Sequence, residues 1–145
     1  MTDLHIIAWA VVRIALAWMF LVPLPGLLKD WQGTVNLSAL LCKWNPRVLA
    51  IISVLIMLFG ALSVLIGIFP RVGALGLCLY SLCGYRVHRQ LARQAKAMAN
   101  KDNQPLVTLA QVGHVTSAQK NIVIAALAFF MVLQGVGPYM LINLF

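Results

Sequence analysis

Polar residues that could do chemistry are few in this 145-residue sequence, and Arg13 is the least expected of them. It interrupts an apolar stretch that runs from His5 to Leu28. A charge in the middle of a membrane helix costs roughly 2.5–3.5 kcal/mol on insertion scales, so such a residue needs a partner or a function. Three other polar groups fall at a similar depth in later apolar stretches, when each residue is counted as about 1.5 Å of helix. They are Ser63, Tyr80 and Gln134.

These four side chains predict a polar ligand-binding pocket in one half of a helical bundle. Arg13 would supply a charge, Ser63 and Tyr80 would supply hydroxyls, and Gln134 would supply an amide. Such a pocket could hold a quinone carbonyl, a lipid phosphate or a small sulfur oxyanion. The alternative is a closed polar core, in which the groups hydrogen-bond to one another and to backbone freed at helix kinks. The sequence leaves both interpretations open.

Residue types for hydrolytic or metal-dependent catalysis are scarce. The sequence has no Glu, and its acidic residues are Asp3, Asp30 and Asp102. Metal-assisted hydrolysis and paired-carboxylate chemistry both need carboxylates close together in space. The cysteines, which show no metal-ligand or redox spacing, are Cys42, Cys78 and Cys83. We therefore expect no catalytic residues, no metal site, no evident cofactor beyond a quinone-like ligand, and no catalytic activity of the chain on its own.

The elements that must position these residues are membrane helices. Hydrophobic residues make up 62% of the chain and charged residues 10%, with a mean hydropathy of +0.92. Soluble domains are nearer to half apolar and a quarter charged. We predict an all-α fold, an integral membrane four-helix bundle forming one domain over residues 1–145. Its spans are expected at about 5–28, 48–69, 72–90 and 122–144, with loops at 29–47 and 91–121. The end of the first span should be broken or kinked by Pro23, Pro25 and Gly26.

A short basic helix is expected after the third span. At helical spacing, its cationic residues fall on one face and apolar residues on the opposite one. These cationic residues are Arg86, Arg89, Arg93 and Lys96. The pattern is typical of a helix that lies in the membrane surface, and a solvated helix end is the alternative.

The distribution of charge predicts the topology. The net charge is +8, and nine Lys or Arg residues fall in 29–47 and 86–120, whereas the opposite side holds only Arg71. The positive-inside rule places the basic loops in the cytoplasm and both termini in the periplasm. Because the aromatic residues lie within apolar runs, the basic excess indicates a partner in the lipid bilayer and no nucleic acid.

Several segments resemble the DoxX family of small bacterial four-helix membrane proteins. The segment Val12 to Phe20, followed by Lys29, is similar to that family's first helix. The stretch from Leu58 to Ala74 resembles its second and third helices, and Gln119 to Tyr139 its last. A His-Gly pair late in the first helix and an acidic residue in the second, both frequent in that family, have no counterpart here, so no role that depends on them carries over.

The resemblance implies a multi-pass protein of the bacterial inner membrane. Related proteins include membrane subunits of thiosulfate:quinone oxidoreductase and partners in thiol-redox complexes. We therefore expect a non-catalytic membrane subunit or accessory of a redox, sulfur or quinone-linked pathway, which binds a lipid or quinone-like ligand near Arg13. Its partners would be a second copy or a redox subunit. The alternatives are a small oligomeric transporter or export accessory for a solute or metal, and a structural anchor that docks a cytoplasmic protein.

Overall fold

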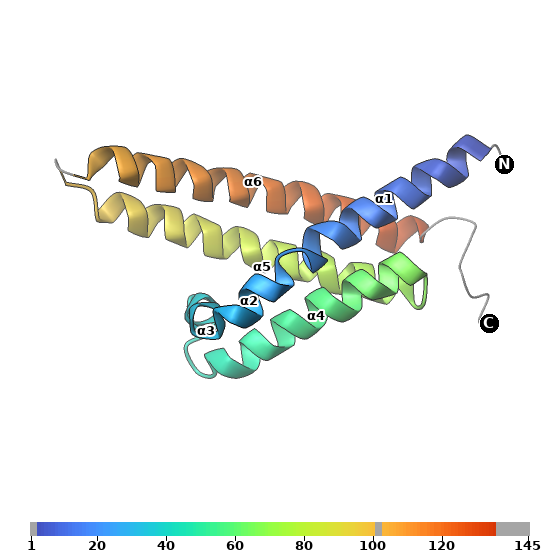
Figure 1. Cartoon of the computed structure of the whole chain (residues 1–145), viewed down its shortest axis with the longest axis horizontal. Coiled ribbons are helices and arrows are strands. Elements are labelled where there is room, and N and C mark those ends of the chain that lie inside the picture. The colour runs from blue at the N-terminus through green and yellow to red at the C-terminus, as the bar shows by residue number, and fades with distance from the viewer. Residues whose placement is uncertain (1–2, 101–102, 136–145) are drawn as a thin grey trace.

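The computed structural model is all-helical and describes residues 3–100 and 103–135, among which there is no strand. The helices are α1 (Asp3–Leu21), α2 (Leu24–Lys29), α3 (Trp31–Ala39), α4 (Pro46–Ile66), α5 (Pro70–Ala97) and α6 (Gln104–Gln134) (Figure 1). Three stretches are long and apolar enough to cross a membrane: Leu4–Lys29, Pro46–Ile66 and Gln104–Gln134. The prediction of an all-helical membrane protein is therefore confirmed.

The predicted break at the end of the first helix is confirmed. The chain leaves α1 after Leu21 and starts α2 at Leu24, with Pro23 at the N-cap, where a missing N–H costs nothing. After α2, the Asp30 carboxylate accepts a hydrogen bond from the Gly33 N–H at 3.0 Å. This N-cap starts α3, a helix within the 29–47 segment that we expected to be a loop. An Asp at the N-cap was the local signal for it.

The turn between α4 and α5 is very short, as expected, but it lies slightly earlier than the predicted Pro70-Arg71. Gly67 ends α4 in the left-handed conformation with φ 90°, and Phe69 also has a positive φ of 47°. Pro70 then opens α5. Glycine adopts this conformation without strain, whereas Phe69 can hold it only because the surrounding turn fixes it.

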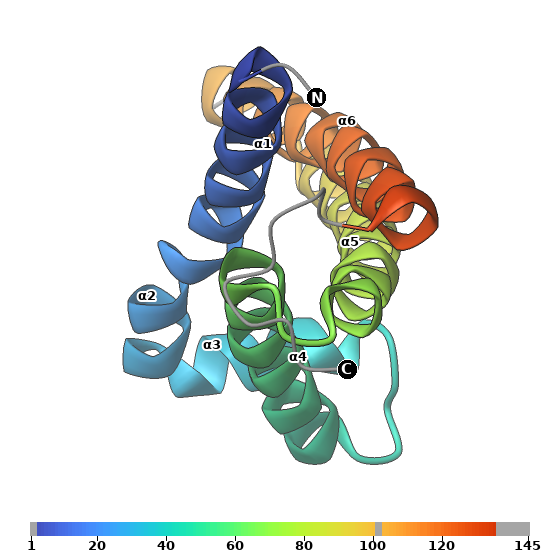
Figure 2. The same cartoon turned by 90° about the vertical axis from the view of Figure 1, so that its right-hand side faces the viewer.

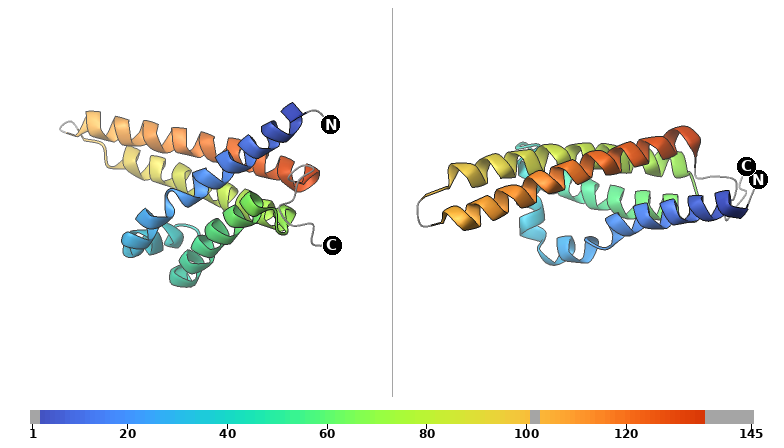
Figure 3. Two further views of the ribbon diagram at one scale, coloured as in Figure 1. Left: turned by 45° about the vertical axis from the view of Figure 1, so that its right-hand side comes forward. Right: turned by 90° about the horizontal axis from the view of Figure 1, so that it is seen from above.

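The expected interfacial helix after the third span is a continuation of α5. Residues 86–97 extend that helix without interruption, so α5 has 28 residues and packs against α6. Figures 1 and 3 show the α5–α6 hairpin projecting past α2 and α3 at one end of the molecule. The predicted end of the third span at residue 90 therefore does not coincide with the end of a helix, because the helical pattern does not change there.

Residues 102–118, which belong to the predicted loop over 91–121, are helical from Gln104 onward. Pro105 and Gly113 suggested a loop, but Pro105 occupies the first turn of α6, where proline is tolerated. Gly113 lies inside the helix, where glycine costs only about 1 kcal/mol. The last ten residues of the predicted fourth span, 135–144, lie almost wholly outside the described residues.

The core is built from five of the helices. Figure 2 shows α1, α4, α5 and α6 nearly end-on, with α2 and α3 beside α4. The larger buried side chains of the core come from α1, α2, α4, α5 and α6, and small residues fill the closest approaches. Its members are Leu16, Ala17, Phe20, Leu24, Met57, Ala61, Val64, Ala74, Leu77, Cys78, Ala125, Ala128 and Met131.

Gly60 and Gly73 mark the closest approach between α4 and α5. A Cβ added at Gly73 would lie 2.5 Å from the Ser63 Oγ and 2.9 Å from the Gly60 carbonyl oxygen. A Cβ at Gly60 would lie 3.1 Å from the Gly73 carbonyl oxygen. Because these obstacles include backbone, the two helices would have to move apart to admit a methyl group.

We therefore predict that Gly73→Ala lowers the free energy of unfolding by about 1–3 kcal/mol, the usual cost of overpacking. The matched control is Gly113→Ala in α6, where nothing lies within 4 Å of an added Cβ. That change should raise stability by about 0.5–1 kcal/mol, because alanine is the better helix former. Thermal unfolding in detergent measures both, and equal stability of the two variants would contradict the packing described here.

Candidate functional site

Arg13 is buried between α1 and the end of α4, with 9% of its surface exposed. Its Nε donates to the Val64 carbonyl oxygen at 3.0 Å, and its Nη2 donates to the Leu65 carbonyl oxygen at 2.6 Å. Both carbonyls belong to the last turn of α4, where backbone acceptors have no partner within the helix. A cation at this position also interacts favourably with the helix dipole. Arg13 therefore caps α4 from a neighbouring helix.

Ser63 fastens the same end of α4 to the start of α5. Its hydroxyl donates to the carbonyl oxygens of Ile68 at 2.5 Å and Phe69 at 3.0 Å. The bond closes the short turn in which Phe69 has its positive φ. Arg13 and Ser63 therefore both act on the final turns of α4, and their common depth in a membrane stays a prediction.

Tyr80 and Gln134 do not join these two residues in one pocket. Tyr80 packs edge-on against Phe20, with ring centroids 5.8 Å apart, and lines a separate cavity. Gln134 is the exposed last residue of α6. The four predicted residues are thus divided between a capping site, a cavity and a helix end. Ligand binding by Arg13, Ser63 and Gln134 stays a prediction.

The cavity that Tyr80 lines has a volume of about 470 Å³ and receives residues from all six helices. Its apolar wall includes Met19, Phe20, Leu27, Leu37, Val54, Met57, Val87, Leu91 and Ile124. Its polar residues are Thr34, Ser38, Ser53, Tyr80, Cys83, His88, His114 and Asn121. A mostly apolar cavity of this size with a few polar groups is the usual form of a small-molecule site.

Two of the polar groups in the cavity already have hydrogen-bond partners. The Thr34 hydroxyl donates to the Leu27 carbonyl oxygen at 2.8 Å, and the Ser38 hydroxyl donates to the Thr34 carbonyl oxygen at 3.0 Å. By contrast, within residues 3–100 and 103–135 the Tyr80 hydroxyl and the Asn121 amide have no hydrogen-bond partner. These two groups keep their full capacity to bind a ligand.

His88 and His114 face each other across the α5–α6 seam on the cavity wall. Their Nδ1 atoms are 3.3 Å apart and their ring centroids 5.6 Å apart. Both side chains are half-buried. In the part of the chain that the structure describes, no group of three or more His, Cys, Asp or Glu side chains is placed to hold a metal ion.

The histidine pair is the feature that the sequence analysis missed. His88 and His114 were expected to be separate histidines in cytoplasmic loops, because 102–118 was predicted not to be helical. The sequence feature that indicates the pair is the symmetry of the two histidines about the hairpin turn. Each histidine is thirteen residues from residue 101 (101 − 88 and 114 − 101). In two antiparallel helices that spacing places them side by side.

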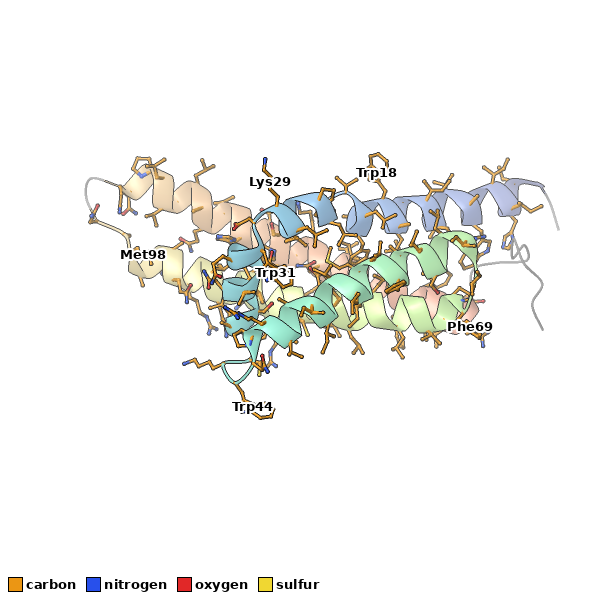
Figure 4. The ribbon with its side chains drawn as sticks, turned by 60° about the horizontal axis from the view of Figure 1, so that its bottom comes forward. Trp18, Lys29, Trp31, Trp44, Phe69 and Met98 are labelled. Carbon is orange, nitrogen blue, oxygen red and sulfur yellow. The ribbon has the colours of Figure 1, made fainter. Side chains whose placement is uncertain are left out.

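The basic residues Arg86, Arg89, Arg93 and Lys96 are all exposed on α5, away from the cavity. Arg89 lies over the Tyr85 ring, 5.8 Å from its centroid, and donates to the Tyr85 hydroxyl at 3.4 Å. These four residues lie in the half of α5 that leads to Met98, and Figure 4 shows Met98 at the opposite end of the molecule from Phe69. Their contact with a membrane surface stays a prediction.

A second hollow lies on the outer face of α4 and α5, with a volume of about 640 Å³. It is lined almost entirely by apolar residues, among them Leu55, Phe59 and Val72. Its polar side chain is Ser63, whose hydroxyl already bonds two carbonyl oxygens. This groove offers contact to lipid chains but little chemical selectivity, so the inner cavity is the better candidate site.

Comparison with protein families gives a match to DoxX. The DoxX family profile matches residues 8–88, a region that includes Arg13, the α4–α5 turn and sixteen of the twenty residues that line the cavity. The chain belongs to the DoxX family. Comparisons with curated proteins and with solved structures found no match. Together with its apolar helices, the family identifies an integral membrane protein.

Arg13 in this DoxX protein should be tested first as a cap on α4. We predict that Arg13→Met lowers the free energy of unfolding by about 1.5–3 kcal/mol, because charge-assisted hydrogen bonds to two carbonyls are lost. Arg13→Lys should be intermediate, since an ammonium lacks the planar fork of a guanidinium.

The control is Arg71→Met, which removes an exposed arginine near the same turn and should change stability by less than about 0.5 kcal/mol. Thermal unfolding of the purified protein in detergent measures all three variants. An Arg13→Met variant as stable as Arg71→Met would show that the two bonds to α4 contribute nothing.

Proposed function

We propose that this DoxX protein is a non-catalytic membrane subunit or accessory of a redox, sulfur or quinone-linked pathway, and that its cavity holds a quinone-like or lipid molecule. The observation that carries the proposal is the cavity itself, about 470 Å³ of mostly apolar space with hydrogen-bonding groups on one wall. An isoprenoid or acyl chain suits the apolar wall, and a polar head suits the wall formed by α5 and α6.

The spacing of the polar groups supports a ligand with a flat or elongated head. Tyr80, Gly84 and His88 are four residues apart along α5, so each step is about 6 Å along the helix axis. The Asn121 amide lies next to Gly84, because a Cβ added there would be 2.9 Å from its Nδ2. Three hydrogen-bonding positions therefore follow one another along about 12 Å of the cavity wall.

The charge of the cavity lining favours binding over transport. Its described lining contains no carboxylate. Proton-coupled carriers generally place an ionisable acid inside the membrane for the coupling step. The close pair of titratable groups in the lining, His88 and His114, has no carboxylate beside it among the described lining residues. We therefore place the chemistry of the pathway in a partner subunit, with this chain holding the ligand and the partner.

The proposal includes a multi-pass arrangement in the bacterial inner membrane, with α5 as a fourth span. The starts of α1 and α5 and the end of α6 lie at one end of the molecule (Figure 3). Toward the other end lie Lys29, Lys43, Arg47, Arg89, Arg93 and Lys96, whereas Arg86 and Lys120 lie near the middles of α5 and α6, and Lys101 lies outside the described residues. Trp44, 95% exposed, is suited to the headgroup region at that end.

The topology is tested with reporter fusions. A periplasm-active phosphatase fused after Phe145 should be active, and a fluorescent reporter that matures only in the cytoplasm should be dark at the same position. Fusions after Asn100, in the hairpin turn, should give the opposite pair of results. The physical reason is that eight described basic residues are retained on the cytoplasmic side. The reverse pattern at both positions would overturn the orientation.

Ligand binding is tested by filling the cavity. Val54→Phe adds bulk at a half-buried position on its wall, and Ile51→Phe places the same aromatic side chain three residues earlier, at an exposed position of α4. We expect Val54→Phe to lower the amount of quinone or phospholipid that co-purifies with the protein by about tenfold, or about 1.4 kcal/mol. Ile51→Phe should leave it unchanged. Quantitative mass spectrometry of the extracts measures both, and equal retention by the two variants would remove the cavity as the binding site.

A further inference from the structure

The histidine pair has a property that the other polar groups of the cavity lack, because its two nitrogen atoms satisfy each other. The Nδ1 atoms of His88 and His114 are 3.3 Å apart, within the range of a weak hydrogen bond. Such a bond requires that one Nδ1 carries a proton and the other does not. The pair is therefore a donor and an acceptor held together until a proton or a ligand changes the arrangement.

Protonation changes what the pair offers to the cavity. When both imidazoles are charged, both Nδ1 atoms carry hydrogens, and neither can accept from the other. Two N–H donors then point toward the same region, and the like charges repel. An oxygen acceptor placed between or beside the two rings would accept these hydrogens and reduce the repulsion.

Among the described residues around the pair, no carboxylate supplies such an acceptor. The charged or titratable groups that act on His88 are His114 and Lys120, both from α6. The cavity residues contributed by α1 to α4 are uncharged, and α5 contributes Tyr80 and Cys83 as its other titratable groups. The cavity that adjoins the pair thus has space for a ligand and no protein carboxylate to compete with it.

We propose that His88 and His114 form the acceptor-binding subsite of the cavity, which binds an oxygen atom of the ligand head more tightly when the pair takes up a proton. The oxygen is a carbonyl of a quinone ring or a carbonyl or phosphate oxygen of a lipid, since all three present the same acceptor chemistry. This inference rests on the proposed function only in that the cavity holds an amphiphilic molecule.

Linkage gives the sign of the effect. If the bound form carries an additional proton on the pair, affinity rises as the pH falls, by up to about tenfold for each pH unit and proton. Histidine is the side chain that changes its charge between about pH 5 and about pH 8, so the titrations should cover this range. Binding should also take up protons from the buffer over this range.

The experiment measures binding of two probes to the full-length protein in detergent, by calorimetry at several pH values. One probe is a short-chain ubiquinone, and the other is phosphatidylglycerol in mixed micelles. Proton uptake is obtained by repeating each titration in two buffers with different heats of ionisation. A purely structural role of the histidines would leave that uptake unchanged, so it separates ligand recognition from packing.

The variants are His88→Gln and His114→Gln, which keep a hydrogen-bonding side chain but cannot be protonated. The matched control is His5→Gln, an exposed histidine on α1 that contacts the Trp9 ring. Wild type and His5→Gln should bind at least one probe about tenfold more tightly at about pH 5.5 than at about pH 8, with proton uptake. Either variant of the pair should show a smaller change in affinity between the two pH values and take up fewer protons than the wild type, because one imidazole remains and the Nδ1 contact is lost.

The outcomes separate the subsite from the proposed function. The probe whose binding depends on the pair identifies the source of the acceptor oxygen. If both pair variants match the wild type in affinity and proton uptake while Val54→Phe abolishes binding, the cavity holds the ligand and the proposed subsite is wrong. If Val54→Phe also matches the wild type, the proposed function fails with it. Since loss of either histidine removes the Nδ1 contact, one well-folded variant is enough to decide.

Discussion

The positive charge of Arg13 must be accommodated among apolar helices, and the way this is done fixes one end of the molecule. An arginine stays protonated at accessible pH, so its N–H groups need acceptors wherever it is buried. The acceptors include two carbonyls in the last turn of α4, which have no partner in their own helix. The Arg13 side chain thus gives its own N–H groups acceptors and gives two carbonyl oxygens at the end of α4 a donor. Ser63 fastens the adjoining turn, and so α1, α4 and α5 share a fixed register at this end.

The opposite end of the molecule is wider because nothing comparable holds it together. Glycines bring α4 and α5 into backbone contact near the turn, and Figure 1 shows the two helices diverging from there toward α3. The short helices α2 and α3 cover part of the space between them, with Thr34 and Ser38 satisfied by local carbonyls. The cavity occupies what remains. A tight end and an open end therefore follow from the positions of one charge and a few small residues.

The sequence was sufficient for the all-helical membrane fold and the break near Pro23. These depend on hydropathy and helical rise, which are local properties of the chain. It was insufficient for the cavity and the histidine pair, because these depend on which faces of α5 and α6 meet. The pair also depends on where α6 starts. Pro105 suggests the end of a helix, but it lies in the first turn of α6, and this start sets the register that places His114 beside His88.

The length of α6 determines where water can reach the protein. Its 31 residues span about 46 Å, whereas the hydrocarbon layer of a bilayer is about 30 Å thick. Tilt accounts for a few ångströms of this mismatch, so more than one full turn of the helix lies outside the hydrocarbon. His114 is ten residues, about 15 Å, from the start of α6, a distance close to the roughly 16 Å by which the helix exceeds the hydrocarbon thickness. With that excess on the side of the hairpin turn, protons from water have a short path to the part of the cavity wall formed by His88 and His114.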